Sequence, residues 1–123
     1  MKEIKMGEIE TRFAEIIWKN EPISTNALIK ICQEELGWKR TTTYTALKRL
    51  CEKGIFQMQY SSVTSLISRR EYYALQSQKF VKETFGGSLP SFLSAFADRQ
   101  TLTPEEIIAI RQFIDSFEEE VST

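Results

Sequence analysis

Apolar side chains in the first half of the chain recur at helical spacing in three successive segments, and the spacing then changes to alternation. The helical segments cover residues 8–19, 24–36 and 40–53, and alternation runs over 55–60 and again over 70–75. The inner faces of the three predicted helices carry these residues: Ile9, Phe13, Ile16 and Ile17; Leu28, Ile31, Cys32 and Leu36; Thr43, Leu47, Leu50 and Cys51.

Chain-breaking residues separate these segments. Pro22 ends the first helix because proline cannot continue the hydrogen-bond ladder, and Gly37 ends the second. The Ser/Thr-rich stretch between the two alternating segments predicts a hairpin with a long polar tip. Three helices followed by a hairpin is the element order of a winged helix-turn-helix domain. We therefore expect a mainly α, α+β winged helix-turn-helix fold, with three helices and a β-hairpin wing, over residues 1–76.

Residues 77–123 are predicted to form a helical dimerisation domain. Gly86 and Gly87 break one helix, and Thr103-Pro104-Glu105-Glu106 provides a capping box for the last one. Such short helices cannot hide their own apolar faces, and two-fold pairing covers each face with its own copy. The residues expected at the dimer interface are Phe92, Phe96, Ile107, Ile110, Ile114 and Phe117. The alternative is a monomer whose last helices fold back onto the winged domain.

The charge is distributed unevenly along the chain. Residues 1–75 hold 12 Lys and Arg against 9 Asp and Glu, whereas residues 76–123 hold 4 against 8, and together these give the net charge of −1. Within 38–54 there are five basic residues and one acidic residue. This concentration of positive charge on the third helix indicates a nucleic-acid partner.

The third predicted helix carries the candidate DNA-reading residues. At 100° per residue, the face opposite the apolar stripe, with Arg49 at its edge, carries Thr41, Tyr44, Thr45, Lys48 and Glu52. Threonine, arginine and lysine suit contacts with base edges and phosphates in the major groove. From this pattern the candidate DNA-binding residues are Arg40, Thr41, Tyr44, Thr45, Lys48 and Arg49, with Arg69 and Arg70 where the predicted wing returns. The alternatives are a solvated basic face and a surface that docks an acidic protein.

The residue inventory disfavours an enzyme and a metal or cofactor site. The chain has no histidine, two cysteines and no glycine-rich phosphate-binding motif. Cys32 and Cys51 are expected to be buried thiols rather than a redox pair, and Trp18 and Trp38 to be core aromatics rather than stacking platforms. No apolar run is long enough to span a membrane and the N-terminus is charged, so we expect a cytoplasmic protein with no membrane insertion.

The segment from Trp38 to Ile55 resembles the penicillinase-repressor family, the BlaI/MecI-type transcriptional regulators. It is similar to that family's pattern of Trp, three residues, Thr-Val-x-Thr-Leu-Leu-x-Arg-Leu and then Lys-Gly, with Thr43 and Ala46 in place of the Val and a Leu. Further matches over nearly the whole chain are Glu10 and Trp18, Arg70-Glu71-Tyr72-Tyr73, Phe-Gly-Gly-Ser at 85–88 and the capping box at 103–106.

This resemblance implies a homodimeric repressor that binds a double-stranded, pseudo-palindromic DNA operator. It carries Thr42, Thr45 and Arg49 onto the family's recognition helix and Arg70 onto its wing. In antibiotic-sensing members a membrane-bound sensor triggers proteolysis between the dimerisation helices. The equivalent bond here is Ala95–Phe96, with alanine where those members have asparagine. The paired C-terminal cysteines of the copper-responsive branch are absent, so copper sensing through that motif is not expected.

Overall fold

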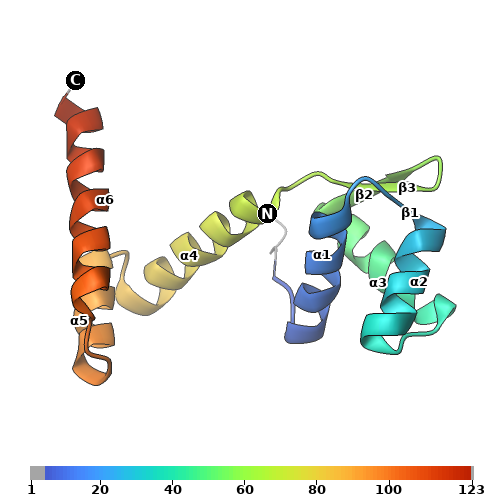
Figure 1. Cartoon of the computed structure of the whole chain (residues 1–123), viewed down its shortest axis with the longest axis horizontal. Coiled ribbons are helices and arrows are strands. Elements are labelled where there is room, and N and C mark those ends of the chain that lie inside the picture. Colours follow the sequence, from blue (N-terminus) through green and yellow to red (C-terminus); the bar gives the residue numbers. More distant parts are fainter. Residues whose placement is uncertain (1–4, 123) are drawn as a thin grey trace. The chain divides into compact units, whose positions relative to one another are not determined.

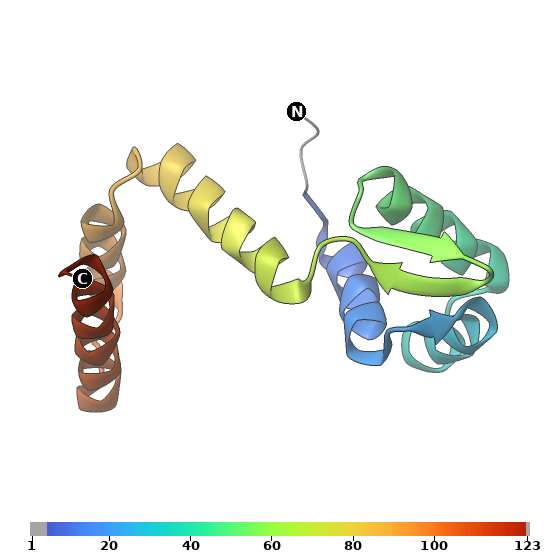
Figure 2. The ribbon, with the colours of Figure 1, turned by 90° about the horizontal axis from the view of Figure 1, so that it is seen from above.

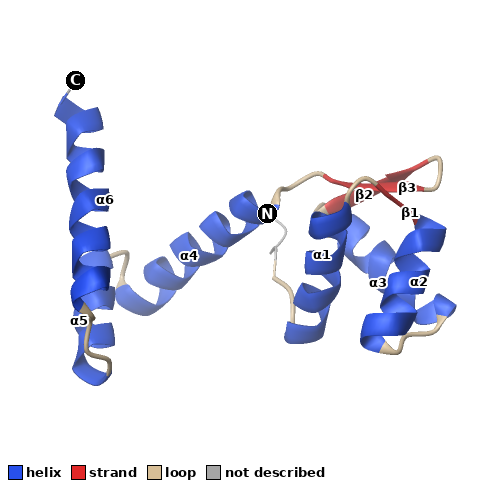
Figure 3. Ribbon diagram, viewed as in Figure 1, coloured by secondary structure: helices blue, strands red, loops and turns tan. Residues whose placement is uncertain are grey.

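The computed structural model describes residues 5–122, which form helices and one small antiparallel sheet (Figure 1; coloured by secondary structure in Figure 3). The helices are α1 (Glu8–Asn20), α2 (Thr25–Leu36), α3 (Arg40–Glu52), α4 (Arg69–Phe85), α5 (Leu89–Arg99) and α6 (Pro104–Ser122). The strands are β1 (Ile23–Ser24), β2 (Phe56–Gln59) and β3 (Ser62–Ser65). The chain divides into two compact units, one ending at Ser77 and the other beginning at Gln78. The mainly α, winged-helix fold class is confirmed.

The three N-terminal helices, α1, α2 and α3, begin and end where the sequence indicates. The Ser24 hydroxyl caps α2 by accepting a hydrogen bond of 3.1 Å from the backbone N–H of Ala27. Gly37 ends that helix in the left-handed conformation, with φ of 66°. Glycine adopts this conformation without the steric cost that a Cβ atom brings, so the turn into α3 depends on it.

The sheet of the first unit lies against the three helices, as Figure 2 shows from above. Its strand order is β1-β3-β2, and Val63 of the central strand pairs with Ile23 on one side and Met58 on the other. Side chains from α1, α2, α3 and the hairpin meet in one core. Its largest fully buried members include Phe13, Ile17, Leu28, Leu50, Ile55, Phe56 and Val63. This core fixes the orientation of α3.

The predicted second strand and tip of the wing are wrong. The hairpin closes through a two-residue turn at Tyr60 and Ser61, so it has no long polar tip, and residues 70–75 belong to α4 rather than to a returning strand. The Ser68 hydroxyl caps this helix by accepting a hydrogen bond of 3.1 Å from the Glu71 N–H. The apparent alternation of 70–75 arises because Tyr72 is buried between exposed neighbours at the start of a helix. The helix predicted to end before Gly86 and Gly87 is accordingly the C-terminal part of this longer helix.

The second unit contains the C-terminal part of α4, followed by the whole of α5 and α6. Thr103 and Glu106 form the predicted capping box at the start of α6, with reciprocal hydrogen bonds of 2.9 and 3.1 Å. The rings of Phe80, Phe85 and Phe92 stack edge to face, with centroids 5.5 to 6.0 Å apart. Over residues 78–119, for which side-chain burial is described, no residue is buried. Within this described range the single chain therefore has no core.

Candidate nucleic-acid interface

Helix α3 is held in the first unit by one apolar face. Leu47 and Leu50 are buried on this face, as predicted, and Cys51 is half-buried. Thr43 lies on the same face and is 2% exposed. Its hydroxyl donates a hydrogen bond of 3.2 Å to the Lys39 carbonyl, so a polar residue occupies this core position without an unpaired group. The inner stripe predicted from the sequence is confirmed.

The opposite face of α3 is exposed to solvent. Its exposed residues are Arg40, Thr41, Thr42, Tyr44, Thr45, Lys48, Arg49 and Glu52. The structure therefore brings together on one helix every α3 residue that the sequence nominated for contact with DNA. A hollow of about 310 Å³ flanks this face between α1 and α3, and Trp38, Thr42 and Arg49 are among the residues that line it.

Local contacts arrange the polar groups of this face. The Arg40 guanidinium lies over the Tyr44 ring, 5.6 Å from its centroid, which orders both side chains at the start of the helix. The Thr45 hydroxyl donates a hydrogen bond of 2.9 Å to the Thr41 carbonyl, and Thr45 is exposed. Within the described chain, the hydroxyls of Thr41 and Thr42 have no hydrogen-bond partner. They are free to bond a ligand.

The basic residues around α3 fall into two groups. Lys53 is engaged, because its ammonium donates a hydrogen bond of 2.7 Å to the Lys5 carbonyl and lies 3.3 Å from the Glu10 carboxylate. Four other cations are exposed and form no ion pair among residues 5–122: Lys39, Arg40, Lys48 and Arg49. The free positive charge of this region is therefore concentrated on the helix itself.

Arg69 and Arg70 do not lie on the wing, which corrects the predicted placement. Both residues begin α4. The Arg69 Nε donates to both carboxylate oxygens of Glu15, at 2.8 and 2.9 Å, and its guanidinium lies 4.8 Å from the centroid of the Tyr73 ring. The hydrogen bond with Glu15 raises the pKa of Arg69, and this cation is paired with a residue of α1. Residues 55–68, which form the actual wing and its flanks, contain no charged side chain.

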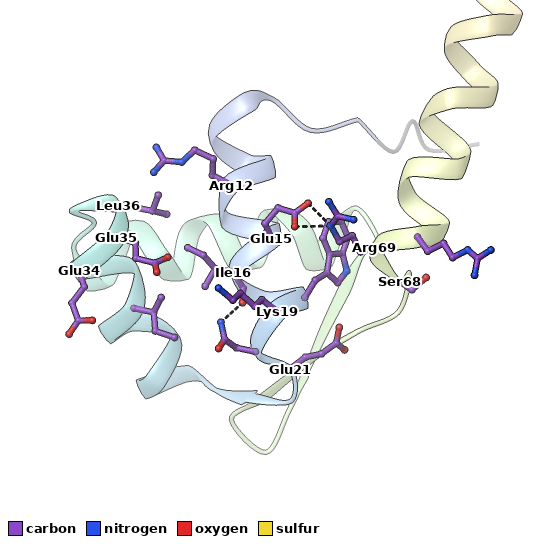
Figure 4. A pocket seen from close by; sticks show the side chains of 14 residues that line it. Arg12, Glu15, Ile16, Lys19, Glu21, Glu34, Glu35, Leu36, Ser68 and Arg69 are labelled. Atoms are coloured by element: carbon purple, nitrogen blue, oxygen red, sulfur yellow. Dashed lines mark hydrogen bonds and ion pairs between the residues drawn. The ribbon is translucent and has the colours of Figure 1, made fainter. Parts of the chain in front are cut away.

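An open groove of about 840 Å³ lies between α1, α2 and the start of α4 (Figure 4). Its charged lining is balanced, with four basic residues (Arg12, Lys19, Arg69 and Arg70) and four acidic ones (Glu15, Glu21, Glu34 and Glu35). Figure 4 shows the Glu15–Arg69 pair on its wall. No residue of α3 lines it. With no excess of positive charge, this groove does not match a phosphate backbone.

The tryptophans and cysteines have structural roles. Trp18 packs against Phe56 and Tyr72 and donates from Nε1 to the Ile67 carbonyl at 3.0 Å, and Trp38 packs on Phe13 with ring centroids 5.2 Å apart. Both cysteines are free thiols. Burial raises the pKa of Cys32 to about 11 and raises the pKa of Cys51 as well, so neither is a reactive thiolate at neutral pH.

The residues nominated for dimerisation lie in the second unit with much of their surface open. Phe92 and Ile110 are half-buried, whereas Phe96, Ile107, Ile114 and Phe117 are 36 to 59% exposed. Ala95 and Phe96, which flank the nominated cleavage bond, are both exposed on α5. Among the described residues, no helix is long and apolar enough to cross a membrane.

Comparison with known proteins decides the family. The sequence profile of the penicillinase repressor family matches residues 6–116. The chain belongs to the penicillinase repressor family. It is 28% identical to the penicillinase repressor of Bacillus licheniformis over 120 residues, which cover 94% of each chain. It is also 24% identical to the methicillin resistance regulatory protein MecI of Staphylococcus aureus over 118 residues, or 93% of this chain and 96% of that one.

The match with the penicillinase repressor family spans both units of the structure. It includes all of α3 and most of α6. The predicted family is therefore confirmed, and the protein belongs to a family of transcriptional repressors.

Proposed function

We propose that this member of the penicillinase repressor family is a sequence-specific DNA-binding repressor that acts as a homodimer on a pseudo-palindromic operator. The observation that carries the proposal is the division of α3 into two faces. One face is fixed in the core by Thr43, Leu47 and Leu50, and the other is solvent-exposed and rich in unpaired cations and hydroxyls. An α-helix with such a face fits the major groove of B-DNA.

The side chains on α3 suit two kinds of contact. Thr41 and Thr42 offer unpaired hydroxyls, and Thr45 offers a methyl group of the kind that packs on thymine. Lys48 and Arg49 extend from the later turns of the helix, where they reach phosphates or guanine edges. In this proposal the threonines discriminate bases, and the cations supply affinity and register.

In this proposal the second unit forms the dimer interface. A helical unit with no buried side chain over its described range gains little stability alone, because hydrophobic burial is the main favourable contribution to folding. Pairing with a second copy would cover the exposed faces of α5 and α6 symmetrically. We place Phe92, Phe96, Ile107, Ile110, Ile114 and Phe117 in that interface. The two winged units of the dimer would then bind the two half-sites of one operator.

Release of the repressor by proteolysis is proposed at Ala95–Phe96. The two side chains are exposed, but the bond lies within α5, so a protease must first unwind this helix to bind it in extended form. Because none of the side chains described over 78–119 is buried, such unwinding disrupts little core. A membrane sensor or a protease acting on the second unit is the partner that this route requires.

Selection of bound sequences from a random duplex library, with the full chain at physiological salt, tests the proposed function. We expect an inverted repeat whose half-sites are separated by one or more helical turns. The competing function is a winged-helix interaction module that docks an acidic protein through α3. Recovery of duplexes without any common motif would contradict the repressor proposal and support that module.

A further inference from the structure

The turn between β2 and β3 places an unusual residue at the tip of the wing. Tyr60 and Ser61 both adopt left-handed backbone conformations, with φ of 53° and 60°. A two-residue hairpin turn with positive φ at both positions favours Asn-Gly, because a bulky side chain is strained in this region. The other described residues with positive φ are all glycine. Backbone geometry therefore does not explain why tyrosine occupies position 60.

The Tyr60 side chain also contributes no contact that stabilises the fold. It is fully exposed, at 103% of its reference area. In the part of the chain that the structure describes, it has no hydrogen-bond partner and no ring contact. A side chain that strains its turn and packs on nothing points to a role outside the folded chain.

The tip that carries Tyr60 is anchored to the helices. The backbone N–H of Thr25 donates a hydrogen bond of 2.9 Å to the Ser61 carbonyl, which joins the turn to the start of α2 (Figure 2). Ser62, the next residue, pairs with Ser24 of β1 and with Gln59 of β2. Tyr60 is thus held at a defined position in the same compact unit as α3.

The surroundings of Tyr60 indicate the chemistry of its partner. Its neighbours Gln59, Ser61 and Ser62 are polar and uncharged, and the whole stretch from Ile55 to Ser68 lacks a charged residue. A stable protein interface buries roughly 800 Å² of surface on each partner. One aromatic ring among polar groups offers far less apolar surface than this. A DNA edge fits it better, because deoxyribose offers apolar C–H surface and the adjacent phosphate accepts a hydrogen bond.

We propose that Tyr60 is a wing-tip contact with operator DNA that involves no ion pair. Its ring packs against a deoxyribose and its hydroxyl donates a hydrogen bond to a phosphate oxygen, beside the base pairs that α3 reads. This inference rests on the proposed function. It assigns to the wing a contribution to affinity that releases no counterion, in contrast with the cations of α3.

The test measures operator affinity by fluorescence anisotropy at several salt concentrations, with the full chain and the selected inverted repeat. Tyr60→Ala is expected to weaken binding by about five- to tenfold without changing the slope of log K against log salt. Tyr60→Phe, which keeps the ring but loses the hydroxyl, is expected to weaken binding by a smaller factor than Tyr60→Ala. The matched control is Leu66→Ala, because Leu66 is 54% exposed at the other end of the hairpin and should leave affinity unchanged.

A second variant separates a DNA contact from a structural role. Asparagine tolerates the left-handed conformation, so Tyr60→Asn is expected to raise the melting temperature by roughly 2–5 °C while weakening DNA binding. If Tyr60 only supported the fold, Tyr60→Asn would change the melting temperature and the DNA affinity in the same direction.

Each remaining outcome bears on the proposal. If the unaltered chain binds DNA specifically and Tyr60→Ala binds equally well, the wing-tip contact is overturned and the proposed function stands. If Tyr60→Ala keeps the DNA affinity of the unaltered chain but loses repression in cells, Tyr60 is assigned to a protein contact. That result also overturns the wing-tip contact with DNA. If the unaltered chain binds no DNA, both the proposed function and the wing-tip contact fail.

Discussion

The Glu15 carboxylate on α1 accepts a hydrogen bond of 2.8 Å from the hydroxyl of Tyr73 on α4, 58 positions later in the chain. The same carboxylate lies 2.8 Å from the Nε of Arg69. The first turns of α4 are therefore fastened to the first helix, beside the ring contacts of Trp18 with Tyr72 and Tyr73. Because of these contacts, the first turns of α4 belong to the same compact unit as the three helices and the hairpin.

Removing the charge of Glu15 should loosen the start of α4. We expect Glu15→Gln to lower the melting temperature on the order of 2–4 °C, because exposed ion pairs and hydrogen bonds contribute modestly. Glu34→Gln is the matched control, since Glu34 is exposed and has no hydrogen bond or ion pair in the described chain. Thermal denaturation followed by circular dichroism measures both. Equal melting temperatures for the two variants would contradict a stabilising role for Glu15.

The stability of the first unit should fall in alkaline solution. The hydrogen bond to Glu15 raises the pKa of Tyr73, and burial raises the pKa of Tyr72, in both cases above the ordinary value of 10.0. A group with a raised folded-state pKa contributes stability that is complete below its unfolded pKa and is lost as pH rises through the folded value. Melting temperatures should therefore decline above pH 10. Tyr73→Phe should show a shallower decline, and an identical pH profile would exclude Tyr73 as a contributor.

Lys48 and Lys53 should differ in their effect on DNA binding. Lys48 is an exposed cation without an ion pair on the outer face of α3, whereas Lys53 is engaged by Glu10. Lys48→Ala is expected to weaken binding to all sequences and to reduce the salt slope by about one. Lys53→Gln should leave that slope unchanged and should lower thermal stability slightly. The reverse pattern in anisotropy titrations would show that the DNA-facing side of α3 is assigned wrongly.

A charge on the apolar face of α6 should separate the protomers. Ile114 is 46% exposed in the single chain, and we expect Ile114→Asp to give monomers that bind the operator much more weakly. Gln112→Asp introduces the same charge at an exposed polar position of the same helix and should leave the dimer intact. Light scattering reports the mass of each variant. A dimeric Ile114→Asp variant would remove this residue from the interface.

The sequence was sufficient to predict the three N-terminal helices, the exposed face of α3 and the capping box of α6. These features depend on local spacing and on residues such as Gly37, Thr103 and Glu106, which act within a few positions of one another. The wing was placed wrongly because Ser62–Ser65 resembles a loop in composition and the start of α4 imitates a strand.

The engagement of Arg69 and Lys53 was not predictable from local patterns. Their partners, Glu15 and Glu10, lie 54 and 43 positions away, and only the folded core brings them together. Similarly, the significance of Tyr60 depends on the turn geometry. Its sequence neighbours do not indicate a two-residue turn, because Tyr-Ser is not a favoured pair for positive φ.

Sequence-specific DNA binding by α3 can be tested by comparing two duplexes of identical composition. One carries the selected inverted repeat and the other a scrambled version, and the dissociation constant of the full chain is measured for each at physiological salt. We predict that the repeat binds at least about a thousandfold more tightly, as specific repressors do. Equal affinity for the two duplexes would contradict sequence reading by α3.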